Sequence, residues 1–268
     1  MNRNKLFVSF FLIALVPTQS LSQDEFRDQY FDSGAAAIHF IEAGEGEPVI
    51  LHHGNTGSVN GWLRTGIFQA LSDNYRVIAM DARGHGKSDK PHDVASYGKE
   101  MSEDIIRLMD HLDIEKAHIV GYSMGTRVFA KALTDQEDRF LSAVFGGFAP
   151  VWDWTREDED QVKIRSEQML ANPPQRLVDQ GQDTIALATL VLGFSELAVT
   201  DDALRSLSLP IIAIVGSEDF LYESVIEFSE LLPRMELVVI EGANHGQALG
   251  RPEFLESVQG FLSSGRAN

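Results

Sequence analysis

A serine flanked by two glycines gives the strongest chemical signal in this chain. The segment Gly121-Tyr122-Ser123-Met124-Gly125 lies between an apolar run, 117–120, and a helix-like stretch, 126–133. A strand, a tight turn and a helix in this order place the hydroxyl at the apex of the turn. The N-terminal end of the following helix favours negative charge beside that hydroxyl. The pattern predicts a nucleophilic serine, but a capping serine would give the same residues, so a base and an acid are also required.

A base and an acid both follow late strands of the predicted fold. The serine needs a histidine that accepts its proton, and the histidine needs a carboxylate that orients it. In doubly wound enzymes of this kind the chain order is serine, acid, histidine. Asp219 and His245 follow the last two predicted strands, so both lie at the edge of the sheet that carries Ser123. We predict a triad of these three residues, with Glu218 or Asp153 as alternative acids.

Two N–H donors are needed to stabilise the negative charge that forms on a substrate carbonyl. The first expected donor is the backbone N–H of Met124, directly after the serine, and the second comes from a loop after an early strand. That loop is His52-His53-Gly54-Asn55-Thr56-Gly57-Ser58, in which Asn55 is the predicted donor. No dense set of further ligands accompanies His52 and His53, so we expect no metal and no cofactor.

The first 22 residues have the pattern of a secretory signal peptide. Arg3 and Lys5 precede an apolar stretch, 6–16, and Pro17 and a short polar segment then lead to Ser22. The apolar stretch is shorter than a spanning helix requires. Cleavage after Ser22 is expected, with a retained N-terminal anchor as the alternative. We predict an exported protein, periplasmic or secreted, with no stable membrane association after cleavage.

The remaining chain is acidic and contains no cysteine. The formal net charge of the 268 residues is −18 and becomes −20 without the predicted signal peptide. This charge disfavours nucleic acid and anionic membranes as partners. The absence of cysteine excludes a thiol nucleophile, disulfides and thiolate metal sites. The expected partner is a small-molecule substrate, and no oligomeric state is predicted.

Strand-like and helix-like segments alternate along most of the chain. The predicted strands are 35–43 (a first strand or a hairpin arm), 48–52, 75–80, 117–122, 141–145, 209–215 and 236–240, and the predicted helices include 62–71, 100–112 and 252–262. Several strands are apolar at every position, which indicates a parallel sheet covered on both faces. Only the segment from about 149 to 208 lacks a strand signal, and it is predicted to be a helical insertion. We predict an α/β fold with a doubly wound, mostly parallel sheet, forming one domain over 23–268.

Five segments together resemble the α/β-hydrolase fold superfamily, in its hydrolase-1 type. They lie in the order of that family, at 53–55, 81–88, 121–125, 216–219 and 242–246. The resemblance implies that the insertion at 149–208 is a lid and that segment 81–88 is structural. Dehalogenases and epoxide hydrolases of the family carry aspartate where this chain has Ser123. The serine therefore implies acyl transfer to water.

Three further residues are candidates for substrate binding. Segments 53–58 and 121–127 are also similar to a menaquinone-pathway lyase of this fold, in which an arginine four residues after the serine binds a carboxylated substrate. Arg127 matches that position, with a structural ion pair as the alternative. Trp152 and Trp154 either line the pocket or fill the core of the lid.

The sequence thus predicts an exported serine hydrolase, carboxylesterase- or lactonase-like, that cleaves a small ester or lactone through an acyl-enzyme. Three alternatives stay open. The first is a lyase or carbon–carbon bond hydrolase acting on a carboxylated substrate. The second is a cofactor-free haloperoxidase or perhydrolase side activity, and the third is a binding protein without turnover.

Overall fold

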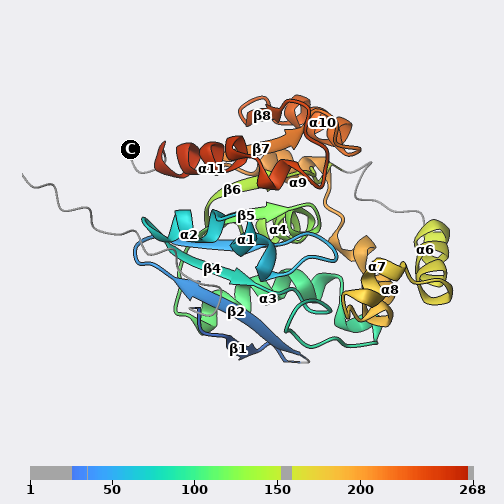
Figure 1. Cartoon of the computed structure of the whole chain (residues 1–268). Coiled ribbons are helices and arrows are strands. Elements are labelled where there is room, and N and C mark those ends of the chain that lie inside the picture. The colour runs from blue at the N-terminus through green and yellow to red at the C-terminus, as the bar shows by residue number, and fades with distance from the viewer. Residues whose placement is uncertain (1–25, 35, 152–158, 265–268) are drawn as a thin grey trace, which may run out of the picture.

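A sheet of eight strands forms the centre of the structure, a computed structural model that describes residues 26–34, 36–151 and 159–264 (Figure 1). The strands are β1 (Gln29–Asp32), β2 (Ala37–Ala43), β3 (Pro48–His52), β4 (Arg76–Met80), β5 (Ala117–Tyr122), β6 (Phe140–Gly146), β7 (Ile211–Gly216) and β8 (Glu236–Ile240). Their order across the sheet is β1-β2-β4-β3-β5-β6-β7-β8. The pairs β1–β2 and β2–β4 are antiparallel, and the other neighbours are parallel. The predicted doubly wound, mostly parallel sheet is therefore confirmed.

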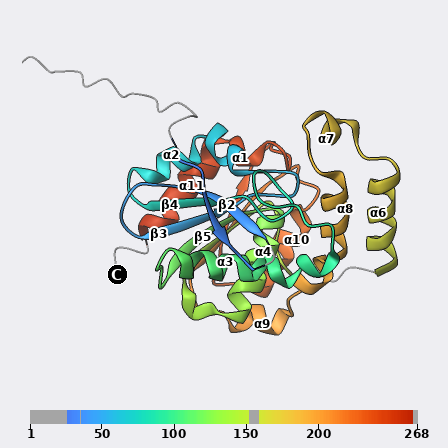
Figure 2. The same ribbon diagram turned by 90° about the horizontal axis from the view of Figure 1, so that it is seen from below.

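Helices cover both faces of this sheet. On one face lie α1 (Val59–Arg64), α2 (Ile67–Ser72) and α11 (Pro252–Ser264); on the other lie α3 (Lys99–His111), α4 (Met124–Asp135) and α10 (Tyr222–Leu231). Figure 2 shows α1 and α2 on one side of the strands and α3 on the other. Short 3₁₀ turns are η1 (Val94–Ser96), η2 (Glu137–Arg139), η3 (Phe194–Leu197) and η4 (Ala248–Gly250). Parallel strands need such crossover helices, which bury the sheet on both sides.

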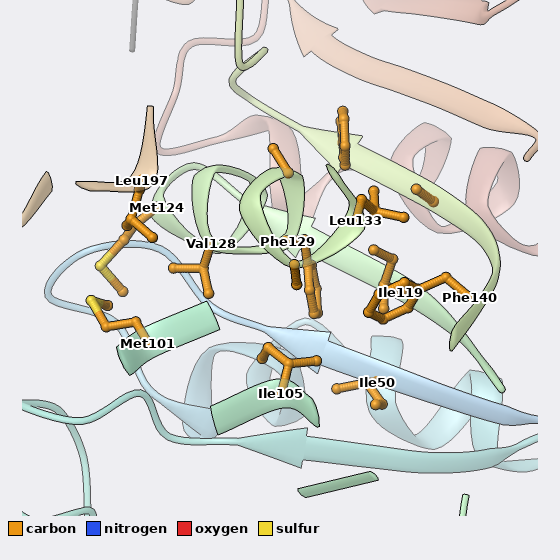
Figure 3. Packing of buried hydrophobic residues seen from close by; sticks show 14 of the residues in the cluster. Ile50, Met101, Ile105, Ile119, Met124, Val128, Phe129, Leu133, Phe140 and Leu197 are labelled. Atoms are coloured by element: carbon orange, nitrogen blue, oxygen red, sulfur yellow. The ribbon is translucent and has the colours of Figure 1, made fainter. Parts of the chain in front are cut away.

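The buried face of α4 fixes the helix that follows the predicted nucleophile. Met124, Val128 and Phe129 are at most 5% exposed and recur at helical spacing, so they form one apolar stripe. Figure 3 shows this stripe packed against Ile105 of α3 and Ile119 of β5. Burial of each such large apolar side chain contributes about 1.5–3 kcal/mol. The stripe therefore holds the N-terminal end of α4 beside the carboxyl end of β5.

The segment between β6 and β7 contains helices and no strand within its described part. The helices are α6 (Glu159–Ala171), α7 (Gln175–Asp179), α8 (Thr184–Leu192) and α9 (Asp201–Ser206). In both views α6, α7 and α8 stand together at one side of the sheet (Figures 1 and 2). The Gln182 side chain donates a hydrogen bond to the backbone oxygen of Thr56, which links this group to the loop after β3. Trp152, Asp153 and Trp154 lie outside the described residues.

No single helix among the described residues has both the length and the hydrophobicity to cross a membrane. The pair Thr184–Leu192 and Phe194–Ser206, bent by 54°, passes the length and composition test only when its two parts are taken together. Both parts contribute to the buried core, where Leu190, Val191 and Leu204 are at most 9% exposed.

One predicted helix differs from the structure, and one strand was not predicted. The helix predicted over 62–71 is two helices, because Gly66 adopts a left-handed φ of 74° between α1 and α2. The segment 35–43, predicted as a first strand or a hairpin arm, contains β2, the second arm of a hairpin whose first arm, β1, was not predicted. Only Phe31 of the four residues in β1 is buried. An edge strand this short has no periodic pattern for sequence reasoning to detect.

Candidate active site

Ser123 lies at the turn from β5 into α4 and has a strained backbone. Its φ is 54° and its ψ is −112°, a region that residues other than glycine rarely adopt. Such a conformation costs about 1–3 kcal/mol and persists only where its surroundings enforce it. The Ser123 amide donates to the backbone oxygen of Gly146 at 2.7 Å, and its carbonyl accepts the Thr126 amide at 3.0 Å. The turn is therefore held from the neighbouring strand and from its own helix.

The two glycines of the motif are sterically required at this turn. A Cβ atom on Gly121 would lie 2.7 Å from the Thr126 amide nitrogen. One on Gly125 would lie 2.1 Å from the carbonyl oxygen of His52. Neither contact is possible for a real side chain. The glycines thus allow α4 to approach β3 and β5 closely, which confirms the steric reasoning behind the sequence motif.

The structure brings Ser123, His245 and Asp219 together in one hydrogen-bonded row. Ser123 Oγ is 3.0 Å from His245 Nε2, and His245 Nδ1 is 2.8 Å and 3.0 Å from the two carboxylate oxygens of Asp219. The Asp219 side chain is fully buried and also accepts the Leu221 amide at 2.9 Å. Because the carboxylate accepts from Nδ1–H, Nε2 faces the hydroxyl with its lone pair. This is the geometry that a general base requires.

Of the two alternative acids the structure describes Glu218, which does not take part in the row. Glu218 is exposed, and Asp219 supplies the carboxylate beside His245. Asp153, the other alternative, lies outside the described residues.

The backbone of the histidine loop is fixed by a tyrosine that sequence reasoning did not select. The Tyr122 hydroxyl donates to the backbone oxygen of His245 at 2.5 Å, and the two rings lie 5.4 Å apart. Burial and the nearby charge of Asp219 raise the pKa of Tyr122, so its hydroxyl keeps the proton that it donates. Tyr122 occupies the first x of the motif Gly-x-Ser-x-Gly, where the pattern accepts any residue type, so the sequence gives no signal for this role.

Both residues predicted to supply oxyanion donors line the pocket that contains Ser123. Met124 is the first residue of α4, so its amide has no acceptor within the helix. A Cβ atom on Gly54 would lie 3.2 Å from the Ser123 Cβ, which shows how closely the loop after β3 packs on the nucleophile. Asn55 and Met124 line the same pocket as Ser123.

The pocket has a volume of about 460 Å³ and opens to solvent. Beside the predicted residues it is lined by Thr56, Phe148, Arg165, Phe194, Phe220 and Leu221, none of which the sequence identified. Phe220 is 74% exposed, and its ring lies 4.9 Å from the His245 ring. A large apolar side chain this exposed at a pocket is suited to contact with a ligand.

Arg127 also lines the pocket, four residues after the serine in α4. It is 8% exposed, and its guanidinium carbon lies 4.8 Å from the ring centre of Phe194 and 5.3 Å from that of Phe148. Cation–π contacts of this kind orient a guanidinium as well as stabilise it.

A buried acidic residue supports the loop after β3 from below. Asp81 accepts the backbone amides of Val59 at 2.7 Å and Lys87 at 2.8 Å, and it bonds His39 Nδ1 at 2.8 Å. The other ring nitrogen of His39 bonds Asp28 at 2.9 Å. Segment 81–88 therefore anchors the neighbouring loop.

Electrostatic interactions stabilise the contacts that Asp81 and His39 make. Burial opposes ionisation of Asp81, but hydrogen bonds from His39 and two amides, and the nearby His53, lower its pKa to about 2. Burial also opposes protonation of His39, yet the carboxylates of Asp81 and Asp28 raise its pKa above 6.5.

Within the described ranges, no group of three or more His, Asp or Glu side chains is placed to hold a metal ion.

The chain belongs to the α/β hydrolase fold family, whose sequence profile matches residues 47–188. It is 32% identical, over 68% of its length, to the dihydrolipoyllysine-residue acetyltransferase component of the acetoin cleaving system of Pseudomonas putida. The match covers 50% of that protein, so the chain spans about half of its length. It is 29% identical to 3-oxoadipate enol-lactonase 1 of Acinetobacter baylyi, over 84% of this chain and 92% of that one.

A solved structure shows the same fold. An esterase of Thermogutta terrifontis superposes with a TM-score of 0.77 at 22% identity, covering 89% of this chain and 99% of the other.

The raised pKa of His39 predicts how stability depends on pH. The folded protein holds this proton to higher pH than the unfolded chain, whose ordinary pKa is 6.5. The stabilisation is complete below that value and is lost as pH rises through the folded pKa. We expect the free energy of unfolding to fall in this window, by at most about 1.4 kcal/mol per pH unit from one proton. Urea unfolding of wild type and His39→Gln from pH 5.5 to 9 measures it.

The control is His111→Gln, which replaces an exposed histidine at the end of α3 and should keep the wild-type pH dependence. Equal slopes in wild type and His39→Gln would show that His39 is not the group responsible.

Proposed function

We propose that this protein is a serine hydrolase that cleaves a small ester or lactone through a covalent acyl-enzyme. One observation carries the proposal: the Ser123 hydroxyl, the His245 ring and the Asp219 carboxylate form a hydrogen-bonded row at the wall of an open pocket. A neutral hydroxyl is a weak nucleophile, and this row supplies the base that activates it and the carboxylate that orients the base.

The reaction proceeds in two halves. Ser123 Oγ attacks the substrate carbonyl while its proton passes to His245 Nε2, and Asp219 stabilises the imidazolium. The amides of Met124 and Asn55 hold the oxyanion of the tetrahedral intermediate. The intermediate collapses to an acyl-enzyme, and His245 returns the proton to the departing alkoxide. Water then attacks the acyl group with the same base, which releases the acid and restores Ser123.

The pocket and one relative favour a small substrate. A volume of about 460 Å³ lies at the small end of ligand pockets, and the 3-oxoadipate enol-lactonase relative acts on a lactone, as its name states. The proposal requires no cofactor. The signal-like segment 1–22, outside the described residues, supports the further proposal that the enzyme is exported. Arg165 and Phe194 in the pocket wall, and the bond from Gln182 to Thr56, support the proposal that residues 149–208 act as its lid.

Arg127 favours a substrate that carries a carboxylate. Its guanidinium lines the pocket, with its carbon 4.8 Å from the ring centre of Phe194 and 5.3 Å from that of Phe148, and arginine is suited to bidentate contact with a carboxylate. The same residue is the observation that supports the second candidate function, a lyase or carbon–carbon bond hydrolase acting on a carboxylated compound.

Substitution of the nucleophile tests the main proposal. Ser123→Ala removes the attacking oxygen and should lower kcat for p-nitrophenyl acetate by roughly 10⁴-fold or more. Ser257→Ala, at a partly exposed position of α11, is the matched control and should match wild type. Asp219→Asn should lose about 10⁴-fold and Glu218→Gln almost nothing, because only the first leaves His245 unoriented. Retention of wild-type turnover by Ser123→Ala would contradict the proposal.

Arg127 predicts a difference between charged and neutral substrates. Arg127→Gln should raise KM for p-nitrophenyl hemisuccinate by about 10-fold or more, the effect of losing one charge-assisted contact of about 1.5–3 kcal/mol. The KM for p-nitrophenyl butyrate should change little. Steady-state kinetics with both esters measure this. Equal changes for the two esters would indicate a structural role for Arg127.

A further inference from the structure

A second strained residue lies in the loop that carries the proposed oxyanion donor. Thr56 has a φ of 60°, within a tight turn closed by the Gly57 amide on the Gly54 carbonyl at 3.0 Å. A β-branched residue in this left-handed region is an outlier, and its strain must be offset by its surroundings. Thr56 and its neighbour Asn55 both line the pocket at Ser123.

One side chain reaches the strained residue from the core. His85 is fully buried, and its Nε2 accepts the Thr56 backbone amide at 3.1 Å. Two oxygens face the ring at 3.2 Å: the Arg83 backbone oxygen at Nδ1 and the Asn55 Oδ1 at Nε2. With the hydrogen on Nδ1, the ring donates to Arg83 and Nε2 accepts the Thr56 amide. Burial and the neighbouring His53 lower the pKa of His85 to about 3, so the ring stays neutral and can accept this bond at neutral pH.

The support beneath His85 is itself rigid. The guanidinium of Arg83 makes two bonds to the buried carboxylate of Asp104, at 2.7 Å and 2.6 Å, which fixes the backbone that holds the His85 ring. The His85 ring also packs edge-on against His53 at 5.1 Å. On its other side the turn is held by Gln182, whose amide donates to the Thr56 carbonyl at 3.2 Å.

We propose that His85 is a positioning residue for the oxyanion site: by accepting the Thr56 amide it fixes the peptide between Asn55 and Thr56, and so holds the turn 54–57 in the conformation that presents the Asn55 N–H, which belongs to the preceding peptide, to the developing oxyanion. The inference rests on the proposed function. Without His85 the Thr56 amide is left with the Asn55 Oδ1 within its own turn as acceptor, so the turn loosens and the Asn55 donor moves. The effect appears in the transition state, where the oxyanion forms, and hardly in substrate binding.

Two polar substitutions of different length separate this role from simple packing. Gln reaches about as far as Nε2 of histidine and can still accept the Thr56 amide, whereas Asn is too short. We expect His85→Asn to lower kcat for p-nitrophenyl acetate by about 10–100-fold with little change in KM. We expect His85→Gln to keep most of the wild-type kcat. Should His85→Asn fail to fold, His85→Leu carries the same expectation.

Comparing an ester with its thionoester gives a turnover ratio that a simple loss of packing would leave unchanged. Sulfur is a weak hydrogen-bond acceptor, so hydrolysis of p-nitrophenyl thionoacetate depends less on the oxyanion donors. The ratio of ester to thionoester turnover should therefore fall in His85→Asn by about the factor lost in kcat. His111→Gln is the control and should keep the wild-type ratio. Thermal unfolding by circular dichroism checks that each variant is folded.

The outcomes distinguish this inference from the function on which it rests. If wild-type turnover does not depend on Ser123, measured with Ser123→Ala in the same assay, the proposed function fails and the inference with it. If turnover depends on Ser123 but His85→Asn and His85→Gln lose kcat equally, or the ester-to-thionoester ratio is unchanged, the inference alone is overturned.

Discussion

The strained turn at Ser123 is the constraint on which the rest of the structure depends. A positive φ at a residue other than glycine costs about 1–3 kcal/mol, and this conformation persists only where surrounding contacts enforce it. The bond from its amide to Gly146 and the packing of α4 against the sheet enforce it. The glycines at 121 and 125 remove the side chains that would prevent this packing. The fold thus holds one hydroxyl away from the helix and toward the loops after β3 and β8.

Around this hydroxyl, two supports hold the groups that complete the site. On one side Asp219 and Tyr122 fix the ring and the backbone of His245. On the other side Asp81 and His85 hold the loop that carries Asn55. Both supports are buried and hydrogen-bonded, which is the condition under which polar groups rigidify a site rather than destabilise the fold. The pocket between them is the part that remains open.

The sequence was sufficient for the parts of the site that follow the order of strands. Ser123, Asp219 and His245 each follow a recognisable apolar strand, and parallel strands bring their carboxyl ends to one edge. The pocket walls could not be found in this way. Phe194 begins η3 and Phe220 lies between β7 and α10, and their meeting depends on how the segment between β6 and β7 packs.

Local backbone conformation was also beyond sequence reasoning in two places. At Gly66 the chain breaks between α1 and α2, although the apolar spacing on both sides is helical. The sequence did not predict this break, because a glycine within such a pattern is compatible with a continuous helix and with two helices. The left-handed Thr56 has no sequence signal, since threonine disfavours that conformation and only the surrounding contacts impose it. Long-range hydrogen bonds, such as those of His85 and Tyr122, become visible only in three dimensions.

The most direct measurement is to map the covalent adduct formed with a fluorophosphonate by tandem mass spectrometry of the full chain. The geometry of Ser123 and His245 predicts one phosphonyl group per chain, on Ser123, with labelling strongly slowed in His245→Ala. An adduct on another residue, or ester turnover by a protein whose Ser123 stays unlabelled, would contradict the assignment of Ser123 as the nucleophile.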